Sequence, residues 1–235
     1  MYRDADGLVV VNVYPRLLGT YGDRGNAEVL QRRTTERGIP ATVLDADPSE
    51  PLPTYGDIYI LGGGEDGNLQ AATAAMAAER ALHAAVDRGA SVLAVCAGFQ
   101  LLGETGLGLL ANRTSMMGKR AVGHLVVQAD ARLQLADPLL VGFENHGGRT
   151  VLADPGEALG TVISGTGNGD DLALEGQLHG RIVATYLHGP VLALNPALAD
   201  HLLGWSVGTL APLPPGFDLL AERARATRLE LLQRQ

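Results

Sequence analysis

One cysteine stands where a strand-like segment ends, and its surroundings suit nucleophilic chemistry. Cys96 follows the apolar run 91–95 and precedes two small residues, Ala97 and Gly98. Small residues between a buried strand and a helix permit the sharp turn of a nucleophile elbow. The helix N-terminus that follows would favour the thiolate through its dipole and its free backbone N–H groups. The competing interpretation is a small cysteine buried in the core, which is common.

A histidine stands at the end of another strand-like segment. His188 lies in the stretch Thr185-Tyr-Leu-His-Gly-Pro190, where glycine and proline stop the strand and leave the histidine at its rim. A cysteine nucleophile needs a base that takes its proton and later protonates the leaving group. A lone histidine is more often structural. A cysteine and a histidine at two strand ends together favour a catalytic pair.

A third strand-like segment ends in Gly62-Gly-Gly64, which offers backbone N–H groups without side-chain obstruction. With the N–H of Ala97, these groups could form an oxyanion hole. The stretch is not a P-loop, because no Gly-Lys-Ser/Thr follows it. The glycine-rich turn 165–169 lies outside any strand-to-helix context and predicts no dinucleotide site. The histidine spacing and the one cysteine predict no zinc site.

The elements that must position these residues alternate between strand and helix in the first part of the chain. Strands are predicted at 8–14, 41–44, 57–61 and 91–95, with a turn at 21–26 and helices at 27–37 and 69–88. Unbroken apolar strands in this rhythm indicate a parallel sheet covered on both faces. Beyond residue 121, strands are predicted at 122–127, 139–143, 159–163 and 181–187, and helices at 195–203 and 217–235. We expect an α/β fold of three layers, with a mainly parallel central sheet flanked by helices, in one domain over 1–235.

Composition excludes several other classes of protein. The net charge is −8 and no run of Lys and Arg occurs, which argues against a nucleic-acid binder. One cysteine excludes an intramolecular disulfide. The N-terminus lacks the order of a signal peptide, and no apolar run reaches the ~18 residues of a membrane span. We therefore expect a cytoplasmic protein.

Four stretches resemble the class I glutamine amidotransferases, within them the cobyric-acid-synthase-like branch, and most closely the glutaminase subunits of lipid II isoglutaminyl synthases. The stretches are Tyr21-Gly-Asp-Arg-Gly-Asn26, Cys96-Ala-Gly-Phe-Gln-Leu-Leu-Gly103, Gly142-Phe-Glu-Asn-His-Gly-Gly-Arg-Thr150 and Thr185-Tyr-Leu-His-Gly-Pro190. The second and fourth indicate only the broad class. The first and third point to the subgroup.

The resemblance implies a subunit that hydrolyses L-glutamine and passes ammonia to a Mur-ligase-like partner in a heterodimer. That partner would amidate the D-glutamate of the lipid II stem peptide, for cell-wall synthesis. ATP and Mg would belong to the partner, and this chain would carry no cofactor. Such a division agrees with the missing P-loop here.

The resemblance also implies roles for single residues. Cys96 would be the nucleophile, His188 the general acid and base, and Arg120 the partner of the glutamine α-carboxylate, which a guanidinium can bind bidentately. The other residues implied to contact the substrate are Gly63, Gly64, Ala97 and Gln100. Arg120 could equally be a surface arginine beside Lys119.

The third member of the catalytic triad is missing from its usual place. Many class I enzymes carry a glutamate two residues after the histidine, where this chain has Pro190. The carboxylate could be Asp23, Glu144 or one supplied by the partner, and the last would tie hydrolysis to complex formation. Asp23 and Asn26 are equally consistent with a simple turn.

Three other functions stay open at this point. The chain could serve another acceptor, such as a corrinoid, with a separate synthetase subunit, because 235 residues leave no room for a fused one. It could be a catalytically silent binding module on the same fold. It could also be a cysteine peptidase.

Overall fold

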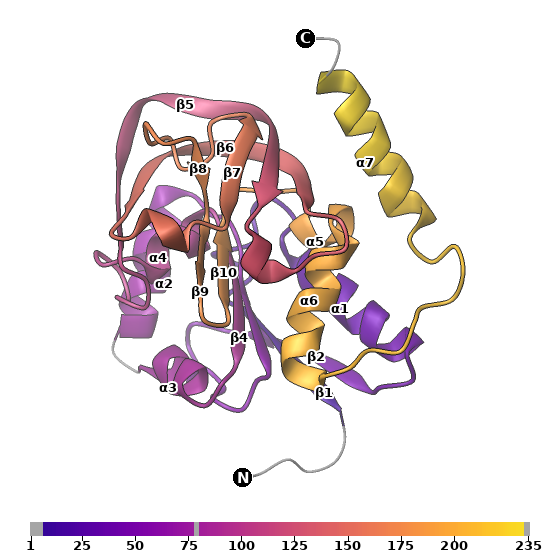
Figure 1. Ribbon diagram of the computed structural model, residues 1–235. Coiled ribbons are helices and arrows are strands. Elements are labelled where there is room, and N and C mark those ends of the chain that lie inside the picture. Colours follow the sequence, from indigo (N-terminus) through magenta and orange to yellow (C-terminus); the bar gives the residue numbers. More distant parts are fainter. Residues whose placement is uncertain (1–6, 78–79, 233–235) are drawn as a thin grey trace.

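A six-stranded sheet forms the centre of the molecule in the computed structural model, which describes residues 7–77 and 80–232 (Figure 1). The strand order is β2-β1-β3-β4-β10-β9, and every neighbouring pair is parallel except β10 and β9. The strands are β1 (Leu8–Val13), β2 (Ala41–Ala46), β3 (Ile58–Leu61), β4 (Ser91–Val95), β9 (Gln177–His179) and β10 (Ile182–Thr185). The carboxyl ends of β3, β4 and β10 therefore meet at one edge, where ligands bind in sheets of this kind.

Helices cover both faces of this sheet (Figure 1). One face carries α1 (Arg24–Glu36), α5 (Val191–Leu194) and α6 (Pro196–Val207), and the other carries α2 (Asp66–Ala77), α3 (Ala81–Asp87) and α4 (Ala97–Leu102). Every residue of β3, β4 and β10 is buried, as expected of parallel strands between two helical layers. The predicted α/β architecture is confirmed.

A second, antiparallel sheet lies beside the first, with the order β6-β5-β7-β8. Its strands are β5 (Asn112–Ala129), β6 (Leu139–Leu152), β7 (Gly160–Ser164) and β8 (Leu174–Glu175), and the short 3₁₀ turns Ala131–Leu133 and Pro155–Glu157 lie in its connections. Phe143 of β6 and His188 exchange backbone hydrogen bonds of 2.8 and 3.2 Å. The two sheets are thus joined at the residue predicted to act as the base.

One hydrophobic cluster includes side chains from both sheets. Its members include four side chains that are fully buried: Val95 of the central sheet, Phe99 of α4, Leu125 of β5 and Tyr186. Burial of apolar side chains on this scale is the main term that stabilises a fold. The second sheet is therefore supported by the same core as the first.

Several predicted elements differ from the observed ones in their bounds. The helix predicted at 69–88 is two helices, because Arg80 takes a left-handed conformation with φ 49° before α3; residues 78–79 lie outside the described part. The turn predicted at 21–26 already contains the start of α1. The strands predicted at 122–127 and 139–143 are parts of the long β5 and β6. The helix predicted to end at 235 is α7 (Leu219–Leu232), and its last three predicted residues are outside the described range.

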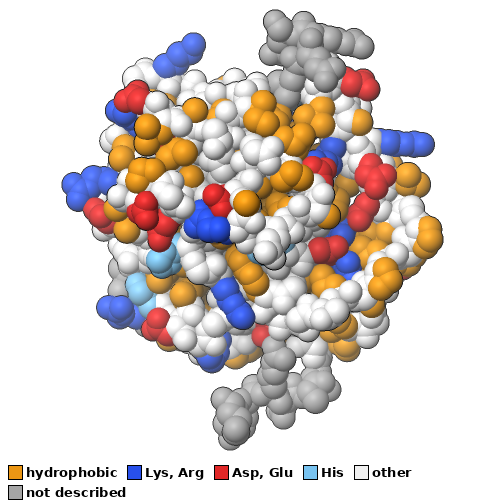
Figure 2. Space-filling view, in the orientation of Figure 1, with side chains coloured by type: hydrophobic (Ala, Val, Ile, Leu, Met, Phe, Trp, Pro, Cys, Tyr) orange, Lys and Arg blue, Asp and Glu red, His pale blue; other side chains and the backbone are white. Residues whose placement is uncertain are grey.

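Acidic and basic side chains are interspersed on the face shown in Figure 2, with apolar side chains between them. No helix within 7–77 and 80–232 has the length and apolar character needed to cross a bilayer.

Candidate active site

Cys96 lies at a sharp turn between β4 and α4. Its backbone has φ 52° and ψ −104°, a conformation that L-residues seldom adopt, and its side chain is 5% exposed. The turn is held by hydrogen bonds from the Cys96 N–H to the Thr185 carbonyl (2.8 Å) and from the Gly98 N–H to the Gly62 carbonyl (3.1 Å). A Cβ on Gly98 would lie 2.5 Å from the Leu61 carbonyl oxygen, so a glycine is required there. The predicted elbow is observed.

The surroundings of Cys96 disfavour its thiolate form. Burial raises its pKa to about 12, and the nearby charge of Asp23 adds to this effect. A hydrogen bond from the Ala97 N–H and the positive charge of Arg120 act in the opposite direction. Because the thiolate is the nucleophilic form, the thiol needs a base to act.

His188 is completely buried beside a carboxylate. Its Nδ1 lies 3.5 Å from Oδ2 of Asp23, which is also fully buried. Its ring packs between Tyr21, at 4.7 Å between centroids, and Phe143, stacked at 5.2 Å. In the part of the chain that the structure describes, neither ring nitrogen has a hydrogen-bond partner, so no hydrogen bond joins the imidazole to the thiol here. Catalytic hydrogen bonds are often long before substrate binds.

Asp23 is held in place by the glycine stretch after β3. Its Oδ2 accepts a hydrogen bond of 2.7 Å from the Gly63 N–H. A Cβ on Gly63 would lie 2.7 Å from Cε1 of His188 and 2.9 Å from Cδ2 of Tyr21. The absence of a side chain at position 63 therefore lets the histidine, the tyrosine and the aspartate approach one another. The Gly63 N–H holds Asp23 in this structure and is not free for an oxyanion.

Glu144, the other candidate carboxylate, has different partners. It accepts hydrogen bonds from the N–H groups of Thr166 (2.8 Å) and Gly167 (2.9 Å), and its Oε2 lies 3.6 Å from Nε2 of His146. Burial alone would raise the pKa of Glu144, but these hydrogen bonds outweigh it and lower the pKa. The structure thus brings Asp23, and not Glu144, against His188.

Asn26, the other polar residue of the first matched stretch, is also buried. Its Oδ1 accepts a hydrogen bond of 2.9 Å from the Leu192 N–H, at the start of α5. It therefore fixes the segment that follows the histidine.

Arg120 reaches the site from the exposed part of β5. Its guanidinium donates to the Asn145 Oδ1 (2.6 Å) and carbonyl (3.2 Å), and to the Tyr21 hydroxyl (3.2 Å). Tyr21 in turn packs on His188. The arginine predicted to bind substrate is therefore exposed, held by hydrogen bonds and one side chain away from His188.

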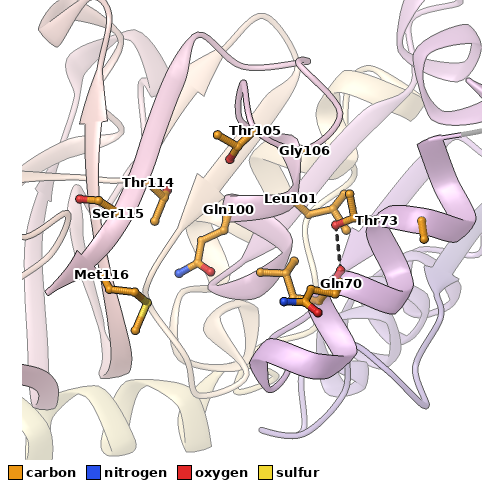
Figure 3. A pocket seen from close by; sticks show the side chains of 11 residues that line it. Gln70, Thr73, Gln100, Leu101, Thr105, Gly106, Thr114, Ser115 and Met116 are labelled. Carbon is orange, nitrogen blue, oxygen red and sulfur yellow. Dashed lines mark hydrogen bonds between the residues drawn. The ribbon is translucent and has the colours of Figure 1, made fainter.

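A cavity of ≈ 680 Å³ lies beside α4, between α2 and the start of β5 (Figure 3). Gln100 projects into it from α4, opposite Ser115 and Met116 of β5. The Gln100 Nε2 donates to the Tyr186 hydroxyl at 3.3 Å, which leaves its carbonyl oxygen available to another donor. Among the described residues, no three His, Cys, Asp or Glu side chains are grouped as metal ligands.

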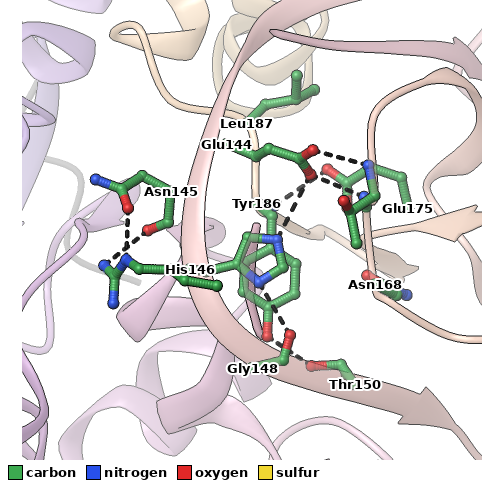
Figure 4. A network of polar contacts seen from close by, with 12 residues as sticks. Glu144, Asn145, His146, Gly148, Thr150, Asn168, Glu175, Tyr186 and Leu187 are labelled. Carbon is green, nitrogen blue, oxygen red and sulfur yellow. Dashed lines mark hydrogen bonds and ion pairs between the residues drawn. The ribbon is translucent and has the colours of Figure 1, made fainter. Parts of the chain in front are cut away.

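A buried polar network surrounds Tyr186 and was not predicted (Figure 4). His146 stacks on Tyr186 at 3.8 Å and bonds to the Gly148 carbonyl, and Tyr186 bonds to Thr150. His146 thus braces the site and does not enter it. Four members, His146, Gly148, Thr150 and Tyr186, lie in the matched stretches, which was the available signal. Glu175 gave none, because it stands on a two-residue strand.

Comparison with known proteins agrees with this geometry. Residues 9–196 match the family described as the CobB/CobQ-like glutamine amidotransferase domain. The chain is 35% identical over 199 residues to the GatD subunit of the glutamine-hydrolyzing lipid II isoglutaminyl synthase of Staphylococcus aureus, covering 79% of each chain. It is 31% identical to the GatD subunit of Streptococcus pneumoniae over 235 residues, covering 92% of this chain and 88% of the relative. The solved structure of PurLQS from Thermotoga maritima has the same fold, with a TM-score of 0.61 at 19% identity over 95% of this chain and 99% of that one. With the family match extending over most of its length, the chain belongs to the CobB/CobQ-like glutamine amidotransferases.

Proposed function

We propose that this chain is the glutaminase subunit of a lipid II isoglutaminyl synthase. It would hydrolyse L-glutamine and deliver ammonia for amidation of D-glutamate in the lipid II stem peptide. The observation that carries the proposal is its 31–35% identity, over most of its length, to two subunits of that name. The buried His188 beside Asp23 and the exposed Arg120, both near the turn at Cys96, also support glutamine hydrolysis.

Hydrolysis would proceed through a thioester. The Cys96 thiol gives its proton to His188 and the sulfur attacks the carboxamide carbon of glutamine. The N–H groups of Ala97 and Gly64 would donate to the oxyanion that develops on the amide oxygen. His188 then protonates the leaving nitrogen, which departs as ammonia. A water molecule, deprotonated by His188, cleaves the thioester and releases glutamate and the free thiol.

Three side chains would prepare this reaction. Asp23 would orient the imidazole and stabilise its protonated form, given its 3.5 Å separation from Nδ1. Arg120 would bind the α-carboxylate of glutamine, because it is exposed and held by Tyr21 and Asn145. Gln100 would accept a hydrogen bond from the substrate through its free carbonyl oxygen.

The acceptor chemistry would belong to a second subunit. A Mur-ligase-like partner in a heterodimer would bind ATP, Mg and the lipid-linked peptide, and this chain would need no cofactor. The reaction would take place in the cytoplasm, where a single cysteine remains reduced. Among the described residues neither ring nitrogen of His188 has a hydrogen-bond partner, which supports a site that becomes fully active in the complex.

The test is ammonia release from L-glutamine by the wild-type chain and by Cys96→Ala, alone and with the Mur-ligase-like protein. We expect release that needs Cys96 and rises with the partner. Labelling of Cys96 by 6-diazo-5-oxo-norleucine in the same mixtures gives a second readout. No ammonia and no labelling in any mixture would leave a silent binding module and end the proposal. Release of amino acids from peptides in place of ammonia would point to a peptidase.

The source of the orienting carboxylate has its own test. If Asp23 fills this role, Asp23→Asn lowers kcat by roughly 10³- to 10⁴-fold with the partner present. A carboxylate supplied by the partner predicts that Asp23→Asn keeps most of its partner-dependent activity. Glu144→Gln is the matched control, because Glu144 is buried nearby but bonds to His146.

A further inference from the structure

Glu175 is a fully buried carboxylate that none of the proposed chemical steps uses. It is the last residue of β8, and its Oε1 accepts hydrogen bonds from the Thr185 hydroxyl and from the Tyr186 N–H (3.1 Å). Among the described residues its Oε2 has no partner. Burying an ionisable group is costly, so a carboxylate that persists there needs a reason.

Thr185, the partner of Glu175, bonds to the backbone of Cys96 and to the residue directly before His188. Its carbonyl oxygen accepts the Cys96 N–H at 2.8 Å. Its hydroxyl accepts the Leu187 N–H at 2.9 Å, which turns the chain out of β10 directly before His188. A shift of Thr185 would therefore move the elbow and the histidine together.

The segment from Thr185 to His188 is anchored at both ends by the second sheet. At its start, Glu175 of β8 binds the Thr185 hydroxyl and the next N–H. At its end, His188 exchanges two backbone hydrogen bonds with Phe143 of β6. Figure 4 shows Glu175 close to Tyr186 within this polar network. The anchors are polar and directional, so they fix the segment more specifically than apolar packing would.

We propose that Glu175 and Thr185 are positioning residues, which set the separation of Cys96 and His188 by holding the segment between β10 and the histidine. This inference rests on the proposed glutaminase function of the pair. The hydrogen-bond acceptor on residue 175 and the hydroxyl on residue 185 are the groups that matter. Neither residue contacts substrate in this assignment.

The test uses disruptive and conservative variants of both residues in the complex with the partner. We expect Thr185→Val and Glu175→Met to lower kcat by about 100-fold, the effect of a misplacement of about 1 Å, with the KM for glutamine changed less than about threefold. Thr185→Ser and Glu175→Gln keep the hydroxyl and the acceptor, and should recover most of kcat. Thr34→Val is the control, because it removes another buried hydroxyl that bonds only within α1.

Cys96 provides a readout that does not need turnover. It is the one cysteine of the chain, so the rate of alkylation by iodoacetamide and its pH profile report on this site alone. We expect Thr185→Val and Glu175→Met to shift that profile, while Thr34→Val leaves it at the wild-type position. Thermal unfolding of every variant shows whether the protein is folded at the assay temperature.

Two results would overturn the inference. Disruptive variants that are folded and keep wild-type kcat and alkylation profiles would show that the two residues only stabilise the fold. The same holds if the conservative variants lose as much activity as the disruptive ones. If the wild-type complex has no glutaminase activity, the proposed function is refuted instead. In that case, alkylation profiles of Thr185→Val and Glu175→Met that match the wild type still refute the positioning role.

Discussion

The burial of Glu175 makes the stability of this protein depend on pH in a predictable way. Burial raises the pKa of this carboxyl from its ordinary 4.5 to about 7, despite the hydrogen bonds from Thr185 and Tyr186. Between these two values the native protein holds a proton that the unfolded chain has lost. Stability therefore falls as pH rises from about 4.5 to about 7 and then levels. A pKa difference of about 2.5 units corresponds to about 3 kcal/mol at 1.36 kcal/mol per unit.

Glu175→Gln removes this titration while keeping an acceptor for Thr185. The difference in unfolding free energy between the variant and the wild type should therefore grow in favour of the variant by about 2–3 kcal/mol from pH 5 to pH 8. Urea unfolding followed by circular dichroism at each pH measures it. Glu50→Gln, which removes an exposed carboxylate, is the control and should show little change across the same range. A difference for Glu175→Gln that stays within about 0.5 kcal/mol over that range refutes the reasoning, because it would mean that the native carboxyl titrates as it does in the unfolded chain.

Three further predictions follow from the packing around the site and the C-terminal segment. Gly63→Ala should lower ammonia release by at least about 100-fold, because the new Cβ would lie 2.7 Å from Cε1 of His188; activity near wild type would contradict the crowding. Cys96→Gly should be more stable than Cys96→Ala by about 1–2 kcal/mol in urea unfolding, because glycine relieves the strained φ of 52°, and equal stabilities would argue against strain. Arg33→Ala should cost about 2–3 kcal/mol of unfolding free energy, since this 4% exposed arginine pairs with two aspartates at 2.5 and 2.7 Å; a loss below about 0.5 kcal/mol would show that the pairs contribute little.

The strands of the central sheet could be predicted because buried strands consist mostly of apolar residues. The runs at 8–13, 58–61 and 91–95 are apolar apart from Asn12 and Ser91, as expected of strands that lie between two helical layers and are buried on both faces. The break between α2 and α3 could not be predicted, because the segment is rich in alanine, which favours a helix along its whole length. The strands β8 and β9 have two and three residues, which are too few for any periodicity, and each exists through its pairing with a neighbouring strand, β7 or β10.

The local sequence points to the predicted catalytic pair, whereas the contacts around that pair depend on the fold. Cys96 and His188 stand at strand ends next to small or strand-breaking residues, so the local sequence already suggests a site. Asp23 lies in a turn that any protein could contain, and only the folded chain brings it to within 3.5 Å of His188. Glu175 is flanked by Leu174 and Gly176, and nothing local distinguishes it from a surface glutamate. Contacts between residues far apart in the chain decide such roles.

The raised pKa of the Cys96 thiol also bears on how the idle subunit withstands oxidants. Peroxides react with thiolates, and burial raises the pKa of the Cys96 thiol, which disfavours its ionised form. A thiol that stayed ionised while waiting for substrate would be lost step by step to sulfenic and sulfinic acids. A buried thiol that keeps its proton is therefore protected from this oxidation until a base is brought against it.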